Sequence, residues 1–436
     1  MNNKKIKLET DSYKGVRDFF PEDMFVQNYI FGIMKKVVEK FGYQEYTASV
    51  LEPADLYKAK SGEEIVSQQT YTFIDRGDRE VTLRPEMTPT LARMIAARRR
   101  ELPTPIRWYS IPNLFRYEKP QRGRLREHWQ LNVDLFGVKS VDADVEILSI
   151  VSEILRTFGL KDQDFEIRVN SRKIVNFILN EMFSLNEVDA LKVSKLIDQK
   201  KKMKDGEFEK GIKEIMPEMS NGFLTLLNSK NFAEFSREIP EGIVIQESLK
   251  EISDLLGNLE NLGITNVVFD QTIMRGFDYY TGMVFEVYDK NPANPRAIFG
   301  GGRYDDLLAI FGSDKVPAVG FGAGDVIIRD LLETYNLMPK YKNPTELYIC
   351  IASVSAKGFA QDLAQTLRAQ GLNVAIDYTN KKVGDQIKYA DKMKIPFITV
   401  IGDNEISSGQ IKIKKLETGV ETILGEDAIV SFIKAN

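Results

Sequence analysis

Residues 114–136 read LFRYEKPQRGRLREHWQLNVDLF, and their pattern decides the fold. In the second half of the stretch, polar and apolar residues alternate, as they do along a strand with one buried face. The polar positions of that half are His128, Gln130, Asn132 and Asp134. In the first half, Arg116 and Glu118 share a face in the same way. The middle, KPQRGRLRE, is too basic to be core, so we predict two antiparallel strands joined by a long basic tip.

A strand pair with one polar face has two interpretations. It can be the wet side of an edge hairpin, which is a common arrangement. Here the face carries arginine, glutamine and aspartate, which suit fixed hydrogen bonds better than a mobile solvated surface does. We therefore interpret it as the floor of a ligand site. The arginine-rich tip suits a polyphosphate, because guanidinium groups bind phosphate oxygens in a bidentate manner.

The composition describes a globular chain and excludes several classes of protein. The chain has 436 residues, of which 43% are hydrophobic and 28% charged, so two to three domains are expected. The sequence contains neither an apolar stretch of membrane-spanning length nor an apolar leader at its start. Its single cysteine and single histidine exclude an internal disulfide and an ordinary zinc site, which indicates a reducing cytosolic compartment. The net charge of −4 predicts no bulk affinity for nucleic acid, although local basic patches can still bind it.

Hydrophobic periodicity divides the chain into regions. Residues 22–41 form a helical stripe, and strand-like segments follow up to about residue 170. Residues 172–262 change to Lys, Glu, Leu and Ile at helical spacing, which predicts a helical insert. Residues 301–336 predict a glycine-rich turn, a strand and a helix. Strands and helices alternate after residue 339 and predict a small α/β domain. Five lysines cluster around one helix of that domain, where a solvated face is the simpler interpretation.

Three further segments carry polar residues in unusual settings. In VTLRPEMTPT (81–90), a strand ends at Leu83, Thr88 is expected to cap a helix, and Glu86 lies in the turn before it. The stretch IMRGFDYYTGMVFEVYD (273–289) places an arginine, an acid and two tyrosines before an alternating strand that we interpret as scaffold. The glycines of FGGGRYDDL and PAVGFGAGD allow close backbone approach, but GFGAG alone is a weak nucleotide signal.

Taken in order, these segments resemble the histidyl-tRNA synthetases, a class II aminoacyl-tRNA synthetase family. KGVRDFFPEDM, TLRPEMT, FRYEKPQRGRLREHWQ, RGFDYYTG and GGGRYDDL each look like stretches of that family, and KKVGDQIKYADKMKIPFITVIG looks like part of its anticodon-binding domain. The resemblance implies an α+β catalytic domain over 1–338, with an antiparallel sheet flanked by helices and a helical insert at about 172–262. It also implies an anticodon-binding α/β domain over 339–436.

The resemblance also implies a reaction in two steps. L-histidine attacks the α-phosphate of ATP, which Mg²⁺ accompanies, and gives histidyl-adenylate and pyrophosphate. The histidyl group then passes to the 3′ end of tRNA(His). A cytoplasmic homodimer with no membrane association is expected.

Site residues carry over to the matching positions. Arg116 and Arg275 are expected to act at the α-phosphate as catalytic groups. The expected ATP-binding residues are Arg116, Glu118, Arg124 and His128, with Glu118 facing the adenine, Arg124 by the γ-phosphate, and His128 stacking on the base in place of the usual phenylalanine. The expected histidine-binding residues are Glu86, Met87, Thr88, Arg116, Gln130, Asp134, Arg275, Tyr279, Tyr280 and Tyr304. Gln121 in the basic tip is expected to look toward the tRNA acceptor end. No protein side chain is assigned to a metal.

Two positions depart from the family pattern, and one alternative function stays open. The arginine that usually lies early in the helix of the third class II motif is replaced by Ile327, and the usual proline of the first motif by Ser49. Arg329, about 200° round the helix from Ile327, is not expected to replace the missing arginine. The alternative is a regulatory histidine-binding paralogue without aminoacylation activity. A class II synthetase for another amino acid is argued against by RGFDYYTG and GRYDD.

Overall fold

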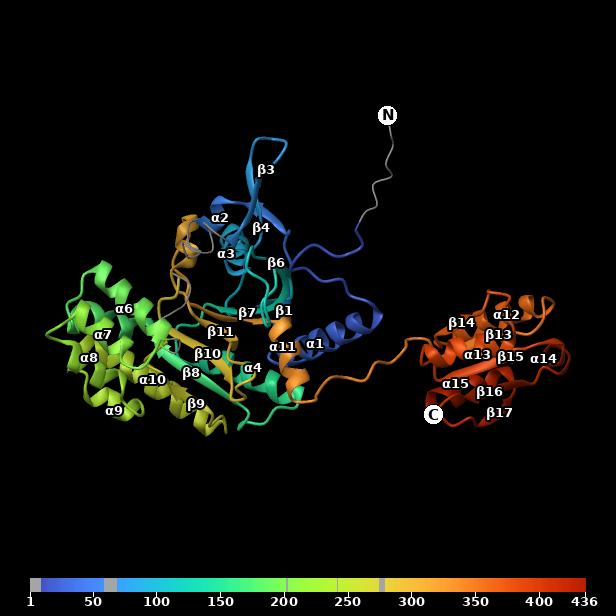
Figure 1. Cartoon of the computed structure of the whole chain (residues 1–436). Helices are drawn as coiled ribbons and strands as arrows, with labels where there is room; N and C mark the ends of the chain where they lie inside the picture. The colour runs from blue at the N-terminus through green and yellow to red at the C-terminus, as the bar shows by residue number, and fades with distance from the viewer. Residues whose placement is uncertain (1–8, 59–68, 201–202, 241, 274–278) are drawn as a thin grey trace, which may run out of the picture. The chain divides into compact units, whose positions relative to one another are not determined.

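The structure is a computed structural model that describes residues 9–58, 69–200, 203–240, 242–273 and 279–436. The chain divides into two compact units, Met1–Pro339 and Lys340–Asn436 (Figure 1). Each unit has its own hydrophobic clusters, so each is described by itself. Within the described ranges, no helix has the length and apolar character needed to cross a bilayer.

A nine-stranded sheet, counted over the described residues, forms the centre of the first unit. Its order is β1-β5-β7-β12-β11-β10-β8-β9, with β6 paired to β7. The strands are β1 (Gln44–Glu45), β5 (Ile106–Ser110), β6 (Asn113–Phe115), β7 (Glu127–Phe136), β8 (Phe165–Ser171), β9 (Val267–Phe269), β10 (Met283–Asp289), β11 (Ala297–Arg303) and β12 (Ala318–Gly324). All pairings are antiparallel except β1 with β5 and β8 with β9. The predicted antiparallel sheet is therefore confirmed.

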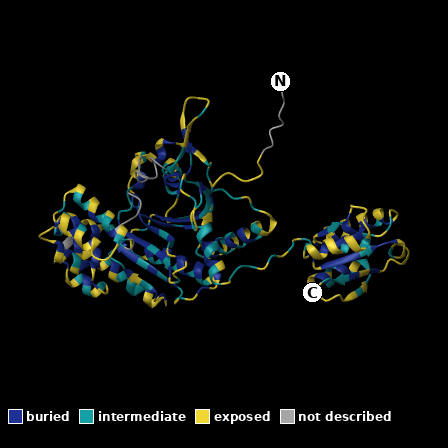
Figure 2. Cartoon of the chain, in the orientation of Figure 1, coloured by how far each residue is buried: buried dark blue, intermediate teal, exposed yellow. Residues whose placement is uncertain are grey.

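Three helices pack against one face of this sheet. They are α1 (Pro21–Lys40), α4 (Asp142–Phe158) and α11 (Asp325–Thr334). Their apolar stripes meet Leu131, Val133 and Leu135 of β7 in one buried cluster, as the alternation of that strand predicts. In Figure 2 the strands of the sheet and parts of the helices beside it are coloured as buried. The opposite face of β7 is thus left for polar side chains.

A second, three-stranded sheet has the order β2-β4-β3 and leads into the turn before a helix. Its strands are β2 (Leu51–Pro53), β3 (Tyr71–Ile74) and β4 (Glu80–Leu83), accompanied by α2 (Asp55–Lys58), α3 (Thr88–Ala97) and the 3₁₀ helix η4 (Leu307–Phe311). The strand end predicted at Leu83 is observed. The capping role expected for Thr88 is wrong, because α3 begins at Thr88 and Met87 is the residue before it, without a side-chain cap.

The helical character predicted for residues 172–262 is observed. The elements are α5 (Arg172–Asn176), the π-helical turn η2 (Phe177–Met182), α6 (Glu187–Gln199), α7 (Glu207–Ile215), α8 (Ser220–Leu227), α9 (Phe232–Arg237) and α10 (Ile243–Asn261). Buried residues of this region, such as Phe223 and Phe235, belong to the same hydrophobic cluster as the main sheet. These helices therefore share the hydrophobic core of the main sheet rather than forming a separate one.

The second unit is a five-stranded sheet of order β14-β13-β15-β16-β17 covered by helices. The elements are β13 (Leu347–Ile351), α12 (Ala356–Ala369), β14 (Val374–Ile376), α13 (Val383–Lys392), β15 (Phe397–Ile401), α14 (Asp403–Ser408), β16 (Ile411–Lys415), β17 (Glu421–Leu424) and α15 (Glu426–Ala435). The alternating α/β pattern predicted after residue 339 is confirmed. The short α14 and β17 were not predicted.

The three glycines 300–302 lie inside β11 rather than in the predicted turn. The reason is close approach between strands. A Cβ atom on Gly301 would lie 2.3 Å from the carbonyl oxygen of Gly320, and one on Gly320 would lie 2.2 Å from Oδ1 of Asp134. Real Cβ contacts are essentially never this short, so a side chain at either position would displace the sheet or the carboxyl group.

Gly320→Ala should therefore destabilise the first unit. We expect the free energy of unfolding to fall by about 1–3 kcal/mol, the usual cost of overpacking a well-packed site. The matched control is Gly257→Ala in α10, where a Cβ would meet nothing within 4 Å. That control should raise stability by about 0.5–1 kcal/mol, because alanine has the higher helix propensity. Denaturant unfolding measures both, and equal effects of the two substitutions would contradict the close-approach argument.

Candidate active site

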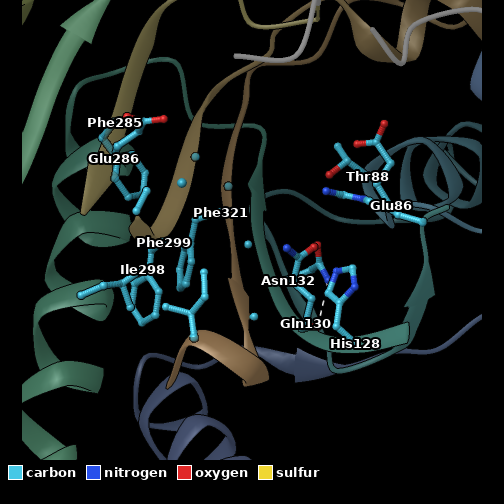
Figure 3. A pocket seen from close by; sticks show the side chains of 18 of the residues that line it. Glu86, Thr88, His128, Gln130, Asn132, Phe285, Glu286, Ile298, Phe299 and Phe321 are labelled. Carbon is cyan, nitrogen blue, oxygen red and sulfur yellow. Dashed lines mark hydrogen bonds between the residues drawn. The ribbon is translucent and has the colours of Figure 1, made fainter. Parts of the chain in front are cut away.

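A cavity of about 860 Å³ opens on the polar face of the main sheet. Its walls come from β7, β10, β11 and β12, from the turn before α3, from the basic tip between β6 and β7, and from α6. Figure 3 shows His128, Gln130 and Asn132 on the same side of the pocket as Glu86 and Thr88, with Phe285, Glu286, Phe299 and Phe321 on the other side. Segments that are far apart in the sequence thus meet in one pocket.

The polar face predicted for β7 forms one wall of this cavity. His128, Gln130, Asn132 and Asp134 all line it. Asn132, which was not among the predicted site residues, donates from Nδ2 to the backbone oxygen of Gln130 at 2.9 Å. The same alternation that identified its neighbours identifies Asn132 as well. Asn132 lines the pocket because it lies on the same face of β7 as His128, Gln130 and Asp134.

Asp134 lies at the closed end of the pocket. It is 2% exposed, and Tyr304 donates a hydrogen bond from its hydroxyl to Oδ1 of the carboxylate. Oδ2 is buried and has no hydrogen-bond partner among the described residues. Burial raises the pKa of Asp134 to about 7. A buried carboxylate oxygen without a partner is costly, so this end of the pocket favours a ligand that donates an N–H.

Two adjacent tyrosines complete the walls around Asp134. The rings of Tyr279 and Tyr280 lie 5.0 Å apart, and Tyr279 meets Tyr304 at 5.6 Å in an edge-to-face contact. Tyr279 donates from its hydroxyl to Oε2 of Glu86 at 3.1 Å. The aromatic walls with one acid at the base leave a slot suited to a small planar ring.

Glu86 and Arg116 bring opposite charges to the middle of the pocket. Glu86 is 2% exposed and lies in the turn just before α3, as predicted. Arg116 donates from Nε to the backbone oxygen of Pro85 in the same turn, at 2.8 Å. This bond fixes the guanidinium next to Glu86 and Thr88. The arrangement can hold a cationic and an anionic group of one ligand side by side.

The outer end of the pocket carries Glu118, Arg124 and His128. Arg124 forms an ion pair from Nε to Oε2 of Glu118 at 3.1 Å. Burial, together with the charges of Arg116, Arg17 and Arg124, lowers the pKa of His128 to about 3. The imidazole of His128 is therefore neutral at physiological pH, and a neutral ring can stack on a flat base without repelling the surrounding arginines.

Two predicted site residues do not line the pocket, and a third lies outside the described residues. Met87 is fully buried beneath the turn and does not line the cavity. Gln121 is exposed in the basic tip, where its backbone pairs with that of Arg124. Arg275 lies outside the described residues. The remaining predicted residues line the cavity: Glu86, Thr88, Arg116, Glu118, Arg124, His128, Gln130, Asp134, Tyr279, Tyr280 and Tyr304.

Strand β10, predicted to be scaffold only, also lines the pocket. Glu286 faces it from a position opposite Gly300, and Phe285 reaches it from the hydrophobic core. Phe299 and Phe321, whose rings stack at 5.7 Å, reach it in the same way. The glycines of β11 and β12 carry no side chains that would separate the pocket from these phenylalanine rings. This part of the pocket could have been recognised only from the pairing of the two glycine-rich strands, β11 and β12, and the sequence alone does not show that pairing.

Comparisons with known proteins agree on one family. Residues 15–324 match the histidyl-tRNA synthetase family, and residues 346–436 match the anticodon-binding domain family. The histidine–tRNA ligase of Leptospira biflexa is 42% identical over 414 residues, which cover 95% of this chain and 94% of that protein.

Solved structures give the same result. Histidyl-tRNA synthetase from Nostoc sp. PCC 7120 has a TM-score of 0.83 at 22% identity and covers 98% of this chain and all of that one, which supports the fold. The apo histidyl-tRNA synthetase of S. aureus has a TM-score of 0.74 at 26% identity and covers 98% of this chain and 100% of that one.

The single histidine makes the electrostatics of the pocket directly measurable. We expect the ring-proton NMR signals of His128 to show no inflection between pH 5 and 9, because its pKa is lowered to about 3. The neutral form is favoured by the fold, so His128 costs stability only as pH falls from about 6.5 toward 3. His128→Phe identifies the signals by their loss. An inflection near pH 6.5 in the folded protein would contradict this description.

Proposed function

The chain belongs to the histidyl-tRNA synthetase family and is a histidine–tRNA ligase, and from this we propose how its pocket activates L-histidine with ATP and charges tRNA(His). The observation that carries the proposal is the sequence of charges along one cavity. Asp134, which is 2% exposed, and His128 lie toward opposite ends of β7, and Glu86, Arg116 and the more exposed Arg124 line the same cavity. Histidine and ATP present groups complementary to these.

Histidine fills the closed end in this proposal. Its α-ammonium group needs acceptors, which Glu86, Thr88 and Gln130 supply. The imidazole donates one N–H to the free Oδ2 of Asp134, while a tyrosine hydroxyl, with Tyr280 the preferred candidate, serves its other nitrogen. A site that leaves buried groups unpaired with the wrong ligand can reject analogues by as much as ~10⁴–10⁵-fold.

The activation step joins the two substrates next to Arg116. An oxygen of the histidine carboxylate attacks the α-phosphorus of ATP, and the bond between the α-phosphorus and the bridging oxygen breaks, so that pyrophosphate leaves with the electron pair. In this proposal Arg116, whose Nε donates to the backbone oxygen of Pro85, stabilises the charge that develops on the α-phosphate. Arg275 has the same role in the proposal, by its match to the family. Losing one such donor typically costs on the order of 10²–10³ in rate.

The outer end of the pocket is proposed to bind ATP. Glu118 faces the adenine, His128 stacks on it, and Arg124 approaches the γ-phosphate once it leaves Glu118. Among the described residues, no three His, Cys, Asp or Glu side chains gather as metal ligands. The proposal takes Mg²⁺ to arrive on the ATP phosphates, since Mg²⁺ keeps several waters and needs few protein ligands. When bound, it neutralises charge on the phosphates.

The basic tip and the second unit are proposed to bind tRNA(His). Gln121 is exposed in the tip, where an acceptor end could reach it. In the second unit, α13 and its flanks carry Lys381, Lys382, Lys388, Lys392 and Lys394, and Tyr378 and Tyr389 are exposed nearby. Lysines neutralise phosphates and exposed aromatic rings stack on bases, so this surface suits single-stranded RNA.

Assembly and location complete the proposal. A cytoplasmic homodimer is proposed. The apolar residues Phe73 and Ile74 are exposed on β3, at one edge of the three-stranded sheet, which gives a candidate contact surface. The single cysteine, Cys350, is buried, and burial raises the pKa of its thiol to about 12. An inert thiol of this kind suits a reducing compartment.

The activation step is tested by ATP–pyrophosphate exchange. We expect exchange that depends on histidine and on no other standard amino acid. Asp134→Ala should raise the KM for histidine by at least ~100-fold with little change in the KM for ATP, because it removes the acceptor for the imidazole. A regulatory paralogue would show no exchange, and a synthetase of another specificity would exchange with a different amino acid. Either result would overturn the proposal.

The separate cores of the two units allow a second test. Deleting residues 341–436 should leave histidine-dependent exchange within a few-fold of the full chain, since the pocket lies wholly in the first unit. Charging of tRNA should fall by orders of magnitude, because the lysine-bearing surface is removed. Circular dichroism checks that the shortened chain is folded. Charging at the rate of the full chain would show that the second unit does not bind the tRNA.

A further inference from the structure

Helix α11 offers the ATP end of the pocket no cation. Ile327, at the position where the third class II motif usually has an arginine, lines the pocket with an aliphatic side chain. Arg329 is the only Lys or Arg in this fully described helix. Its guanidinium binds Asp23 of α1 at 3.0 Å and Glu333 at 3.3 Å. Arg329 is therefore held on another side of the helix.

Arg296, just before β11, lies beside Ile327. Both side chains meet at Gly123 of the basic tip. A Cβ atom on Gly123 would lie 3.4 Å from Cδ of Arg296 and 3.5 Å from Cγ1 of Ile327. Gly123, Ile327 and Ala297, the residue after Arg296, line the pocket. Arg296 thus lies at the rim of the pocket, over the position where the family's arginine would begin.

Arg296 is electrostatically strained in the structure. It is half-buried, and burial together with the charge of Arg124 lowers the pKa of its guanidinium, while Glu118 raises it. Its guanidinium makes no hydrogen bond or ion pair with the residues that the structure describes. A half-buried cation beside a second cation is stabilised only when an anion joins them.

The other arginines of the tip already have partners. Arg122 donates to Asn294 at 3.3 Å and to Thr334 at 3.4 Å, and lies 3.9 Å from Asp330. Arg126 donates to the hydroxyl of Tyr13 at 3.1 Å and to the backbone oxygen of Glu118 at 3.2 Å. Arg296 is therefore the arginine in this group whose donors remain available for a ligand.

We propose that Arg296 takes the place of the missing third-motif arginine and binds the terminal phosphates of ATP together with Arg124. The inference rests on the proposed function of the pocket and adds a residue to it. Two guanidinium groups from different segments can hold a polyphosphate between them through charge-assisted, bidentate hydrogen bonds. The phosphate could also belong to the acceptor end of the tRNA, so the test is made without tRNA.

The first test is Arg296→Ala in histidine-dependent ATP–pyrophosphate exchange. The KM for ATP should rise by ~10–100-fold, the range of one lost hydrogen-bonded ion contact, while the KM for histidine stays within about twofold. Arg296→Lys should recover part of the loss. Arg329→Ala is the matched control, with the same change of charge and side-chain size, and should leave the KM for ATP unchanged.

Two further measurements separate phosphate binding from a structural effect. Arg296→Ala should weaken binding of a non-hydrolysable ATP analogue but not of AMP, which lacks the terminal phosphates. Adding Ile327→Arg to Arg296→Ala should restore most of the ATP affinity, because it returns the cation to the family's position. Equal losses for AMP and the ATP analogue, or no rescue, would overturn the inference.

The remaining outcomes are equally decisive. An unchanged KM for ATP in an active enzyme would refute the role of Arg296 while leaving the proposed function intact. A loss confined to the KM for tRNA would assign Arg296 to the acceptor end instead of ATP. Absence of histidine-dependent exchange in the unaltered protein would be a failure of the proposed function itself.

Discussion

The buried carboxylate of Asp325 is the constraint on which the pocket depends. It is 1% exposed and accepts hydrogen bonds from Arg17 at 2.7 Å, from Gln27 at 2.9 Å and from the backbone N–H of Trp129 at 2.9 Å. These three bonds join the N-terminal segment, α1 and β7 to the start of α11. Trp129 lies between His128 and Gln130, so the same contact fixes the direction of two pocket residues. Breaking a buried pair of this kind typically costs ~3–5 kcal/mol, because it leaves an uncompensated charge.

The glycine strands provide the space that this framework encloses. β11 and β12 place Gly300 opposite Gly322 and Gly302 opposite Gly320, so the centre of the sheet has no side chains on its polar face. The carboxylate of Asp134 lies against Gly320, and the amide of Gln130 against Gly322. Glycine is costly in a strand interior because it packs nothing and loses more entropy on folding. Here these glycines leave the backbone and the side chains of β7 open to the pocket.

Much of this arrangement was predictable from local patterns, and the rest depended on strand pairing. The alternation of polar and apolar residues in 127–136 was enough to identify the polar wall of the pocket, because alternate side chains of a strand point to the same face. The strand-to-helix transition at Glu86 was predictable to within one residue. Glu286 and Arg296 were not found, because their importance comes from the strands and loops beside them. The glycines of β11 were mistaken for a turn, since a glycine run predicts a bend unless the opposing strand is known.

In the proposed function, the distribution of charges in the pocket explains why an isoleucine at position 327 is tolerated. Asp134 and Glu86 make the inner half acidic, and Arg116 marks the boundary with an outer half that is basic. In the proposed function, a zwitterionic amino acid enters this field with its carboxylate toward the arginines, and the polyphosphate binds at the arginine end. Binding of the phosphates needs a positive charge at that end of the pocket, and the cation can come from any segment of the chain. In the role proposed for it, Arg296, the residue before β11, supplies that charge, so α11 can carry an isoleucine at position 327 and still begin with Asp325.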